Sequence, residues 1–192
     1  MDQNNEIGED AVRITDSRYD RDLLRLAITH RMIALEARTR TIRLATQLSD
    51  DRIRRMYRDY FAALGGNRVR RRRGKSPRQM AYFRRSLDHE QQAALLGSLL
   101  DVCGLLVRSG PAFRPALEDV GRFCDVYETC LGLWTEEHFS FEHAWYLWQV
   151  YCRDDEFVLA DCPDCGARWL QDTLEILPYN CSACRRHPPV SA

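Results

Sequence analysis

The C-terminal part of the sequence contains two Cys-x-x-Cys pairs, DCPDCG at residues 161–166 and NCSAC at residues 180–184. Fifteen residues separate the two pairs, which lies within the spacing of four-cysteine zinc sites. Two residues between the members of a pair let a tight turn direct both sulfur atoms at one ion, about 2.3 Å away. We therefore predict a zinc site whose ligands are Cys162, Cys165, Cys181 and Cys184.

Four thiolates complete the tetrahedron of zinc and leave no position for water, so we predict one structural Zn²⁺ and no catalytic ion. Gly166 follows the first pair, where a chain that turns around a metal often needs positive φ. Residues 167–177 have the length of a short hairpin between the pairs. Two disulfides and an iron–sulfur cluster are the alternatives for the same cysteines.

The composition predicts a cytoplasmic protein built as one sizeable domain, or as one domain with a small appendage. The chain has 192 residues, of which 45% are hydrophobic, enough for a core. The first residues, MDQNNE, are polar and predict no secretory signal, and no apolar run approaches the roughly 18 residues that span a bilayer. We expect no membrane partner, and in this compartment paired cysteines more often hold metal than form disulfides.

The neutral net charge conceals two oppositely charged stretches. Residues 31–85 carry seventeen basic and four acidic side chains, whereas residues 86–161 carry four basic and fourteen acidic side chains. This asymmetry favours one surface for a polyanion and another for a different partner. Every basic residue except Lys75 is arginine, which can make bidentate contacts to phosphate and guanine.

Apolar periodicity predicts a mainly α-helical fold. We expect a flexible N-terminal arm over residues 1–17, a helical domain over 18–156 and a zinc-binding segment, a small ribbon or knuckle, over 157–192. The predicted helices of the helical domain include one over about 18–37, one from residue 88 to about 107, one that starts near Pro115 and one near 140–152.

Residues 41–63 resemble a helix-turn-helix pair. Two short helical patterns meet at LSD, residues 48–50, where Ser49 or Asp50 can cap the second helix. Gln47 occupies the position that glycine usually takes in such a turn. In a helix-turn-helix the second helix enters the major groove of DNA, and a generic helical hairpin with a solvated basic face is the alternative. The apolar positions expected to pack together are Ile42, Ala45 and Leu48 on one helix and Ile53, Met56 and Tyr57 on the other.

A basic loop follows over residues 66–79. Its sequence includes RVRRRRGKSPR at residues 68–78, and like charges at this density keep a segment exposed. A phosphate backbone is the partner that this charge favours, and a solvated loop without a ligand is the alternative. The candidate DNA-binding residues of the second helix and of this loop are Arg52, Arg54, Arg55, Arg58, Arg68, Arg70, Arg71, Arg72, Arg73, Lys75 and Arg78.

The sequence offers little support for an enzyme. It contains no glycine-rich phosphate loop, no nucleophile elbow and no His-Glu-x-x-His motif. A thioredoxin-like redox site would need a βαβ context around a Cys-x-x-Cys pair, and that context is missing. The cysteines outside the two pairs lack metal-ligand spacing and are predicted to be small core residues: Cys103, Cys124, Cys130 and Cys152.

The order of these features resembles the flagellar transcriptional regulator FlhC family over about residues 20–188. The features are TQLS at 46–49, RMYR at 55–58, KSP at 75–77, HAW at 143–145 and FVL at 157–159, followed by the four cysteines. The resemblance implies that these cysteines are zinc ligands. It also implies a transcriptional activator of flagellar genes that works in a heterohexamer with the helical partner FlhD, binds double-stranded DNA upstream of class II flagellar promoters and assists RNA polymerase.

Two rival functions fit the same residues less completely. An RNA-binding or ribosome-associated zinc ribbon would use the basic residues without promoter specificity. A thiol-redox or metal-handling enzyme would use the paired cysteines as reactive groups. Our expectation is a DNA-binding activator subunit that is not an enzyme.

Overall fold

The computed structural model describes residues 17–63, 72, 77–108, 112–134, 139–153, 156–175 and 180–186, with only the backbone described at 17 and 61–63. Within these ranges the chain is mainly helical and ends in a β-hairpin beside the four cysteines, which confirms the predicted fold class. The N-terminal arm predicted over residues 1–17 lies outside them, apart from Ser17. In chain order the elements are α1 (Ser17–Ala34), α2 (Thr39–Thr46), α3 (Asp50–Ala63), the 3₁₀ helix η1 (Met80–Arg84), α4 (Leu87–Val102), α5 (Leu117–Leu133), α6 (Phe141–Arg153), β1 (Phe157–Asp161), β2 (Arg168–Asp172) and α7 (Ser182–Arg186).

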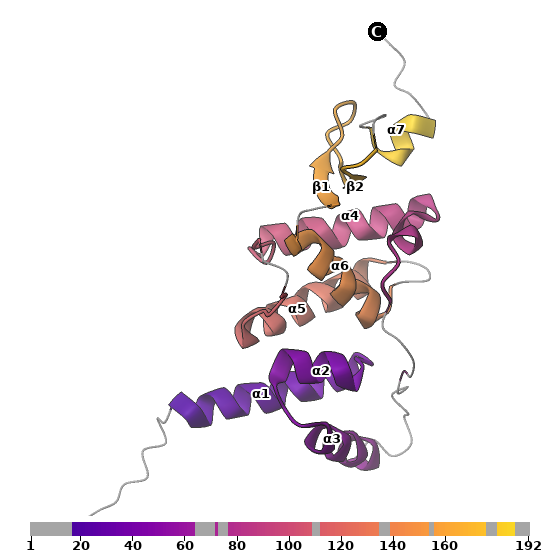
Figure 1. The fold of residues 1–192 in the computed structure, drawn as a ribbon. Coiled ribbons are helices and arrows are strands. Elements are labelled where there is room, and N and C mark those ends of the chain that lie inside the picture. Colours follow the sequence, from indigo (N-terminus) through magenta and orange to yellow (C-terminus); the bar gives the residue numbers. More distant parts are fainter. Residues whose placement is uncertain are drawn as a thin grey trace, which may run out of the picture.

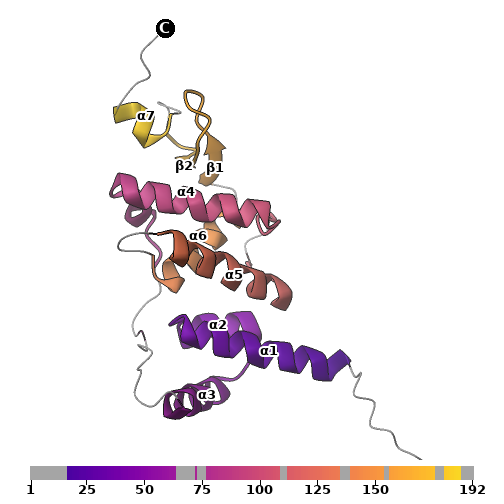
Figure 2. The same ribbon diagram turned by 180° about the vertical axis from the view of Figure 1, so that it is seen from behind.

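The helices are stacked in layers (Figures 1 and 2). One end of the stack is formed by α1, α2 and α3, the middle by α5 and α6, and α4 separates these from the hairpin and α7 at the other end. One hydrophobic core runs through the whole stack, from Ile28 on α1 to Leu170 on β2. None of the helices in the described ranges is long and apolar enough to cross a membrane.

The first helix is close to its predicted range, 17–34 against 18–37. Ile28 and Met32 are buried, whereas Leu23 is 47% exposed, because the first half of α1 extends beyond the other helices (Figure 1). The helix ends when Glu36 adopts a φ of 61°, and the chain turns there into α2.

The helix-turn-helix-like pair is formed by α2 and α3. Gln47 takes a left-handed φ of 58°, the conformation for which glycine is usually selected, and its N–H bonds to the carbonyl of Arg43 at 2.9 Å. The hydroxyl of Ser49 accepts the N–H of Arg52 at 3.3 Å, so Ser49 is the residue that caps α3. The six apolar residues predicted to pack between the two helices are all buried in the core.

The fourth helix ends five residues before its predicted end. Gly104 has a φ of +66°, and the N–H of Leu105 bonds to the carbonyl of Leu100 at 2.8 Å, which is the glycine stop of a Schellman motif. As a result Cys103 is exposed, and its prediction as a core residue was wrong. The start predicted for the next helix is also corrected, because Ala116 is the N-cap of α5 and Pro115 precedes it.

Aromatic side chains fill the core between α5 and α6. The rings of Phe123 and Trp148 stack 4.6 Å apart at 8°, and Trp148 also donates its indole N–H to the carbonyl of Leu105 at 2.9 Å. Cys124, Cys130 and Cys152 are buried, as predicted. Burial raises the pKa of these three thiols to about 12, about 12 and about 11, so they stay protonated near neutral pH.

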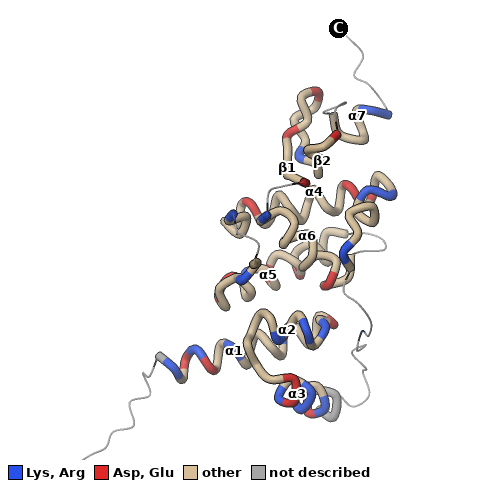
Figure 3. Tube along the Cα trace, viewed as in Figure 1, with Lys and Arg blue, Asp and Glu red and all other residues tan. Residues whose placement is uncertain are grey.

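Part of the opposed charge of the two stretches is paired inside the fold. A guanidinium nitrogen of Arg31, on α1, lies 2.6 Å from Asp125 and 2.5 Å from Glu128, both on α5. These carboxylates raise the pKa of Arg31 further above its ordinary value, even though burial opposes the charge. Figure 3 shows basic positions along α1, α2 and α3 and acidic positions on α5 and the hairpin. The positive charge available to an outside partner is therefore smaller than the sequence count indicates.

The C-terminal hairpin differs from the predicted one. β1 pairs with β2 in antiparallel register, with Ala160 opposite Trp169, so the first Cys-x-x-Cys pair lies in the turn between the strands. The predicted hairpin over residues 167–177 was therefore wrong, since that segment supplies only one of the two strands. The partner strand, β1, comes before the cysteines.

Candidate metal centre and basic surfaces

The four predicted ligands converge on one point. The sulfur atoms of Cys162, Cys165, Cys181 and Cys184 all lie within 4.8 Å of one another. The Sγ atoms of Cys165 and Cys181 are 3.8 Å apart. A zinc–sulfur distance of about 2.3 Å gives a tetrahedron with sulfur–sulfur edges of about 3.8 Å, so the donor set fits an ion of this size. The structure thus contains a four-cysteine site that could hold a metal ion.

The local backbone explains how the first pair turns. Gly166 has a φ of +70°, as predicted, and its N–H bonds to the carbonyl of Cys162 at 2.8 Å. The N–H of Cys162 bonds in turn to the carbonyl of Ala167 at 2.9 Å, which closes the end of the hairpin. The second pair is arranged differently, because Cys184 stands on the short helix α7, which the sequence reasoning did not predict.

Backbone N–H groups point at the sulfur atoms. Burial opposes ionisation of Cys162, but N–H groups of Cys181, Cys165 and Asp164 outweigh it and lower its pKa to about 6. One of these bonds, from the N–H of Cys181, is 3.4 Å long. Burial raises the pKa of Cys181, and the hydrogen bond that the Cys184 thiol donates to the sulfur of Cys165 is the main cause that raises the pKa of Cys184. A cation at the centre of the cluster would stabilise the thiolate form of its cysteines.

The metal centre is fixed to the helical body through its strands. Arg84, on η1, lies 3.4 Å from Asp172 and 2.5 Å from Glu175, and Arg168, on β2, pairs with Asp101 on α4. Leu170 of β2 is buried in the main core, while Trp169 packs with Cys162 and Cys181 in a small cluster of their own. Strand β2 therefore contributes one residue to the cluster beside the cysteines and the next residue to the helical core.

The candidate DNA-binding residues of α3 are all exposed, but they are not equivalent. Arg54 lies 2.9 Å from Asp51 and 4.0 Å from Asp50, so much of its charge is neutralised on its own helix. Arg52, Arg55 and Arg58 have no ion pair within the described ranges. The acidic first turn of α3 is thus paired, and the available positive charge lies along the rest of the helix.

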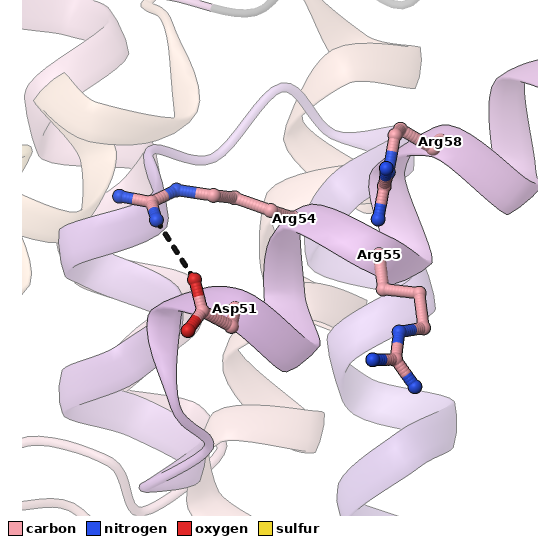
Figure 4. Close-up of a pocket in the computed structure, with 4 residues that line it drawn as sticks. All are labelled: Asp51, Arg54, Arg55 and Arg58. Atoms are coloured by element: carbon pink, nitrogen blue, oxygen red, sulfur yellow. Dashed lines mark hydrogen bonds and ion pairs between the residues drawn. The ribbon is translucent and has the colours of Figure 1, made fainter.

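Two open surface depressions border these arginines. One, of about 510 Å³, is lined by Asp51, Arg54, Arg55 and Arg58. Figure 4 shows Arg54 turned toward Asp51, with Arg55 and Arg58 apart from that pair. The other, of about 490 Å³, lies between α1 and α3 and includes Arg52 and Arg55. Both present guanidinium groups to solvent.

Most of the basic loop lies outside the described residues. Of its predicted contacts, Arg72 is described and lies 2.9 Å from Glu36, and Arg78 is described and exposed. Its other candidates, Arg68, Arg70, Arg71, Arg73 and Lys75, lie outside.

Sequence reasoning missed two further exposed arginines. Arg40, at the start of α2, and Arg153, at the end of α6, line a cavity together with Arg78. No sequence pattern joins three residues this far apart, because only the packing of α6 against α2 brings them together. The high density of arginine in residues 31–85 was the one signal that pointed toward Arg40.

Comparison of the chain with protein-family models and with curated proteins found no match.

Proposed function

We propose that this protein is a DNA-binding subunit of a transcriptional activator, in which a zinc ion bound by four cysteines has a structural role. The observation that carries the proposal is the pair α2 and α3, joined by a three-residue turn, with Arg52, Arg55 and Arg58 exposed on the second helix. Outward-facing arginines on the second helix of such a pair are suited to phosphates and base edges in a major groove.

The chemistry of the metal centre supports a structural ion. Four thiolates leave zinc no open position for a substrate or water. The small cluster of Trp169, Cys162 and Cys181 has too little apolar surface to hold the hairpin end alone. When bound, the ion would supply the cross-link between the β1–β2 turn and α7, and Zn²⁺ is the ion that a compact set of four thiolates favours.

The finer part of the proposal rests on the resemblance to the FlhC family. On that basis the chain acts in the cytoplasm with an FlhD-like partner in a heterohexamer, at promoters of class II flagellar operons, and assists RNA polymerase. Co-expression with an FlhD-like chain, followed by mass determination of the purified complex, tests this part. If the chain stays monomeric with every such partner, the part of the proposal that rests on the FlhC family is contradicted, and only the DNA-binding part is left.

The α3 arginines provide the direct test. In the zinc-loaded protein, Arg55→Gln and Arg58→Gln should each weaken binding to duplex DNA and lower the slope of log affinity against log salt by about 1. Arg21→Gln is the matched control, because Arg21 is exposed on α1 and has no ion pair within the described ranges. Arg54→Gln should have less effect, since Arg54 is already paired with Asp51. Equal slopes in all four variants would show that α3 does not contact the DNA.

A further inference from the structure

The cavity between α2 and α6 has the features of a binding site for a phosphate group. Its volume is about 420 Å³, and its lining comes from α2, from α6 and from the segment around Pro77 and Arg78. Cavities that bind small ligands begin at about 300 Å³, so a phosphate with an attached sugar fits. The charged lining residues are Arg40, Arg78, Arg153 and Glu142.

The three arginines are exposed and available. None of Arg40, Arg78 and Arg153 forms an ion pair or a side-chain hydrogen bond with another part of the chain that the structure describes. In contrast, Arg31 and Arg84 elsewhere in the fold are each paired with a carboxylate. Three guanidinium groups around one cavity, without a carboxylate partner in the described ranges, favour an anion as its ligand.

The one acidic residue of the lining does not oppose an anion strongly. Glu142 is 2% exposed and its oxygens are directed at α2, where they accept the N–H of Arg38 at 2.8 Å and the hydroxyl of Thr41 at 2.9 Å. The guanidinium of Arg38 also lies 4.0 Å from it. The cavity therefore presents a net positive charge to solvent.

The position of Arg78 is set by α6. The hydroxyl of Tyr146 donates a 2.9 Å hydrogen bond to the carbonyl of Arg78, which holds the end of the basic loop against the helix that carries Arg153. The segments that line the cavity are thus held together at the backbone before a ligand arrives. Such preorganisation lowers the entropic cost of binding.

We propose that this cavity binds a phosphate group. Guanidinium groups form bidentate hydrogen bonds to phosphate oxygens, and three of them around one site suit its charge better than that of a single carboxylate. The identity of the ligand rests on the proposed function: α2 is the first helix of the helix-turn-helix-like pair, and in such proteins that helix crosses the DNA backbone. The ligand is then a backbone phosphate of duplex DNA, contacted beside α3.

The first arm of the test measures duplex binding by the full-length, zinc-loaded protein against salt. Arg40→Gln and Arg153→Gln should each weaken binding about tenfold, the loss of one charge-assisted hydrogen bond. Each should also lower the salt slope by about 1. Arg114→Gln is the matched control, an exposed arginine before α5 with no ion pair within the described ranges. Circular dichroism confirms that each variant keeps the helical content of the wild type.

The second arm uses inorganic phosphate with the wild-type protein, so it does not depend on the folding of any variant. Titration at constant ionic strength, with chloride as the reference anion, should shift the Nε–Hε resonances of Arg40, Arg78 and Arg153 and leave that of Arg114 in place.

The two arms separate this inference from the proposed function. If Arg40→Gln and Arg153→Gln bind DNA as Arg114→Gln does, and phosphate shifts none of the three resonances, the cavity is not a phosphate site, whatever the α3 variants do. If phosphate shifts the resonances but the wild type does not bind duplex DNA, the cavity takes a free phosphate compound and the proposed function fails.

Discussion

The carboxylate of Glu142, on α6, accepts a 2.8 Å hydrogen bond from the backbone N–H of Arg38, at the start of α2. Its other oxygen accepts the hydroxyl of Thr41 at 2.9 Å. Because Glu142 is almost fully buried, its carboxylate depends on these bonds for hydrogen-bond partners. Glu142 belongs to the acidic stretch over residues 86–161. It thus holds the first turn of α2, in the helix pair that we propose to bind DNA.

Removal of this carboxylate should destabilise the fold. We expect Glu142→Ala to lower the free energy of unfolding by about 3 kcal/mol, because it leaves the N–H of Arg38 and the hydroxyl of Thr41 buried without their acceptor. Glu142→Gln retains an acceptor oxygen and should cost about 1 kcal/mol. Urea unfolding followed by circular dichroism measures both. Equal losses in the two variants would mean that the hydrogen bonds to α2 are not the reason for the stabilisation.

The close approach of α4 to α6 should make one glycine intolerant of substitution. A Cβ added at Gly97 would lie 2.8 Å from the ring of Tyr151, which is buried and held by a 3.0 Å hydrogen bond to Ala93. We expect Gly97→Ala to destabilise the protein by about 1–2 kcal/mol, the overpacking cost less the gain in helix propensity.

Gly132, on α5, is the matched control, because a Cβ there meets no atom within 4 Å. Gly132→Ala should stabilise the protein by about 0.5 kcal/mol, with thermal unfolding as the measurement. A stabilising Gly97→Ala would contradict the packing of α4 against α6.

The pH dependence of stability should reflect the lowered pKa of His143. Burial, and then the positive charges of Arg72 and Arg38, lower its pKa to about 4, and its ring stacks on Tyr82 with the centroids 4.0 Å apart. In the unfolded chain His143 binds a proton near pH 6.5, whereas in the folded chain it does not. Its contribution to the free energy of unfolding is therefore fully present above that pH. It is lost as the pH falls toward 4.

For the half-exposed ring of His143 we expect a loss of about 1 kcal/mol between pH 7 and 5 that His143→Gln does not show. Titration of the imidazole resonances by NMR gives the pKa itself. A value near 6.5 would show that the ring is not buried against Tyr82 and Ser140.

The metal centre predicts a sharp difference between two exposed cysteines. Cys165→Ser removes one of four converging sulfur atoms, so zinc content should fall from one ion per chain toward none, and the fluorescence of Trp169 beside the site should change. Cys103→Ser is the control, since Cys103 is exposed and lies outside the cluster. Metal analysis of the purified variants is the measurement. Full zinc retention in Cys165→Ser would refute the four-thiolate site.

Local signals in the sequence were sufficient for much of the fold. The Cys-x-x-Cys spacing predicted the metal cluster, and the patterns around Ser49 predicted the α2–α3 pair, because caps, turns and apolar periodicity act over a few residues. Gly104 is a local signal for the end of α4. The apolar residues that follow it continue the helical pattern, and for this reason the predicted helix was too long. The pairing of β1 with β2 was missed because the interval between the cysteine pairs was treated as self-contained.

Interactions between distant segments could not be predicted. Nothing in the sequence around Arg38 indicates that its N–H bonds to Glu142. Nothing around Arg40 indicates that it lines a cavity with Arg78 and Arg153. The number of basic residues in 31–85 likewise does not indicate that Arg31 and Arg84 pair with carboxylates of other segments. These contacts depend on the packing of whole helices.

We propose above that this chain recognises duplex promoter DNA, and competition in raised salt tests this most directly. The zinc-loaded protein, co-purified with an FlhD-like chain, is bound to a labelled flagellar promoter duplex and challenged with unlabelled promoter, unrelated duplex and structured RNA at increasing salt. Raised salt weakens phosphate contacts to every ligand and leaves base contacts as the difference. The account predicts that promoter duplex remains the strongest competitor by at least about tenfold. Equal competition by all three nucleic acids would contradict it.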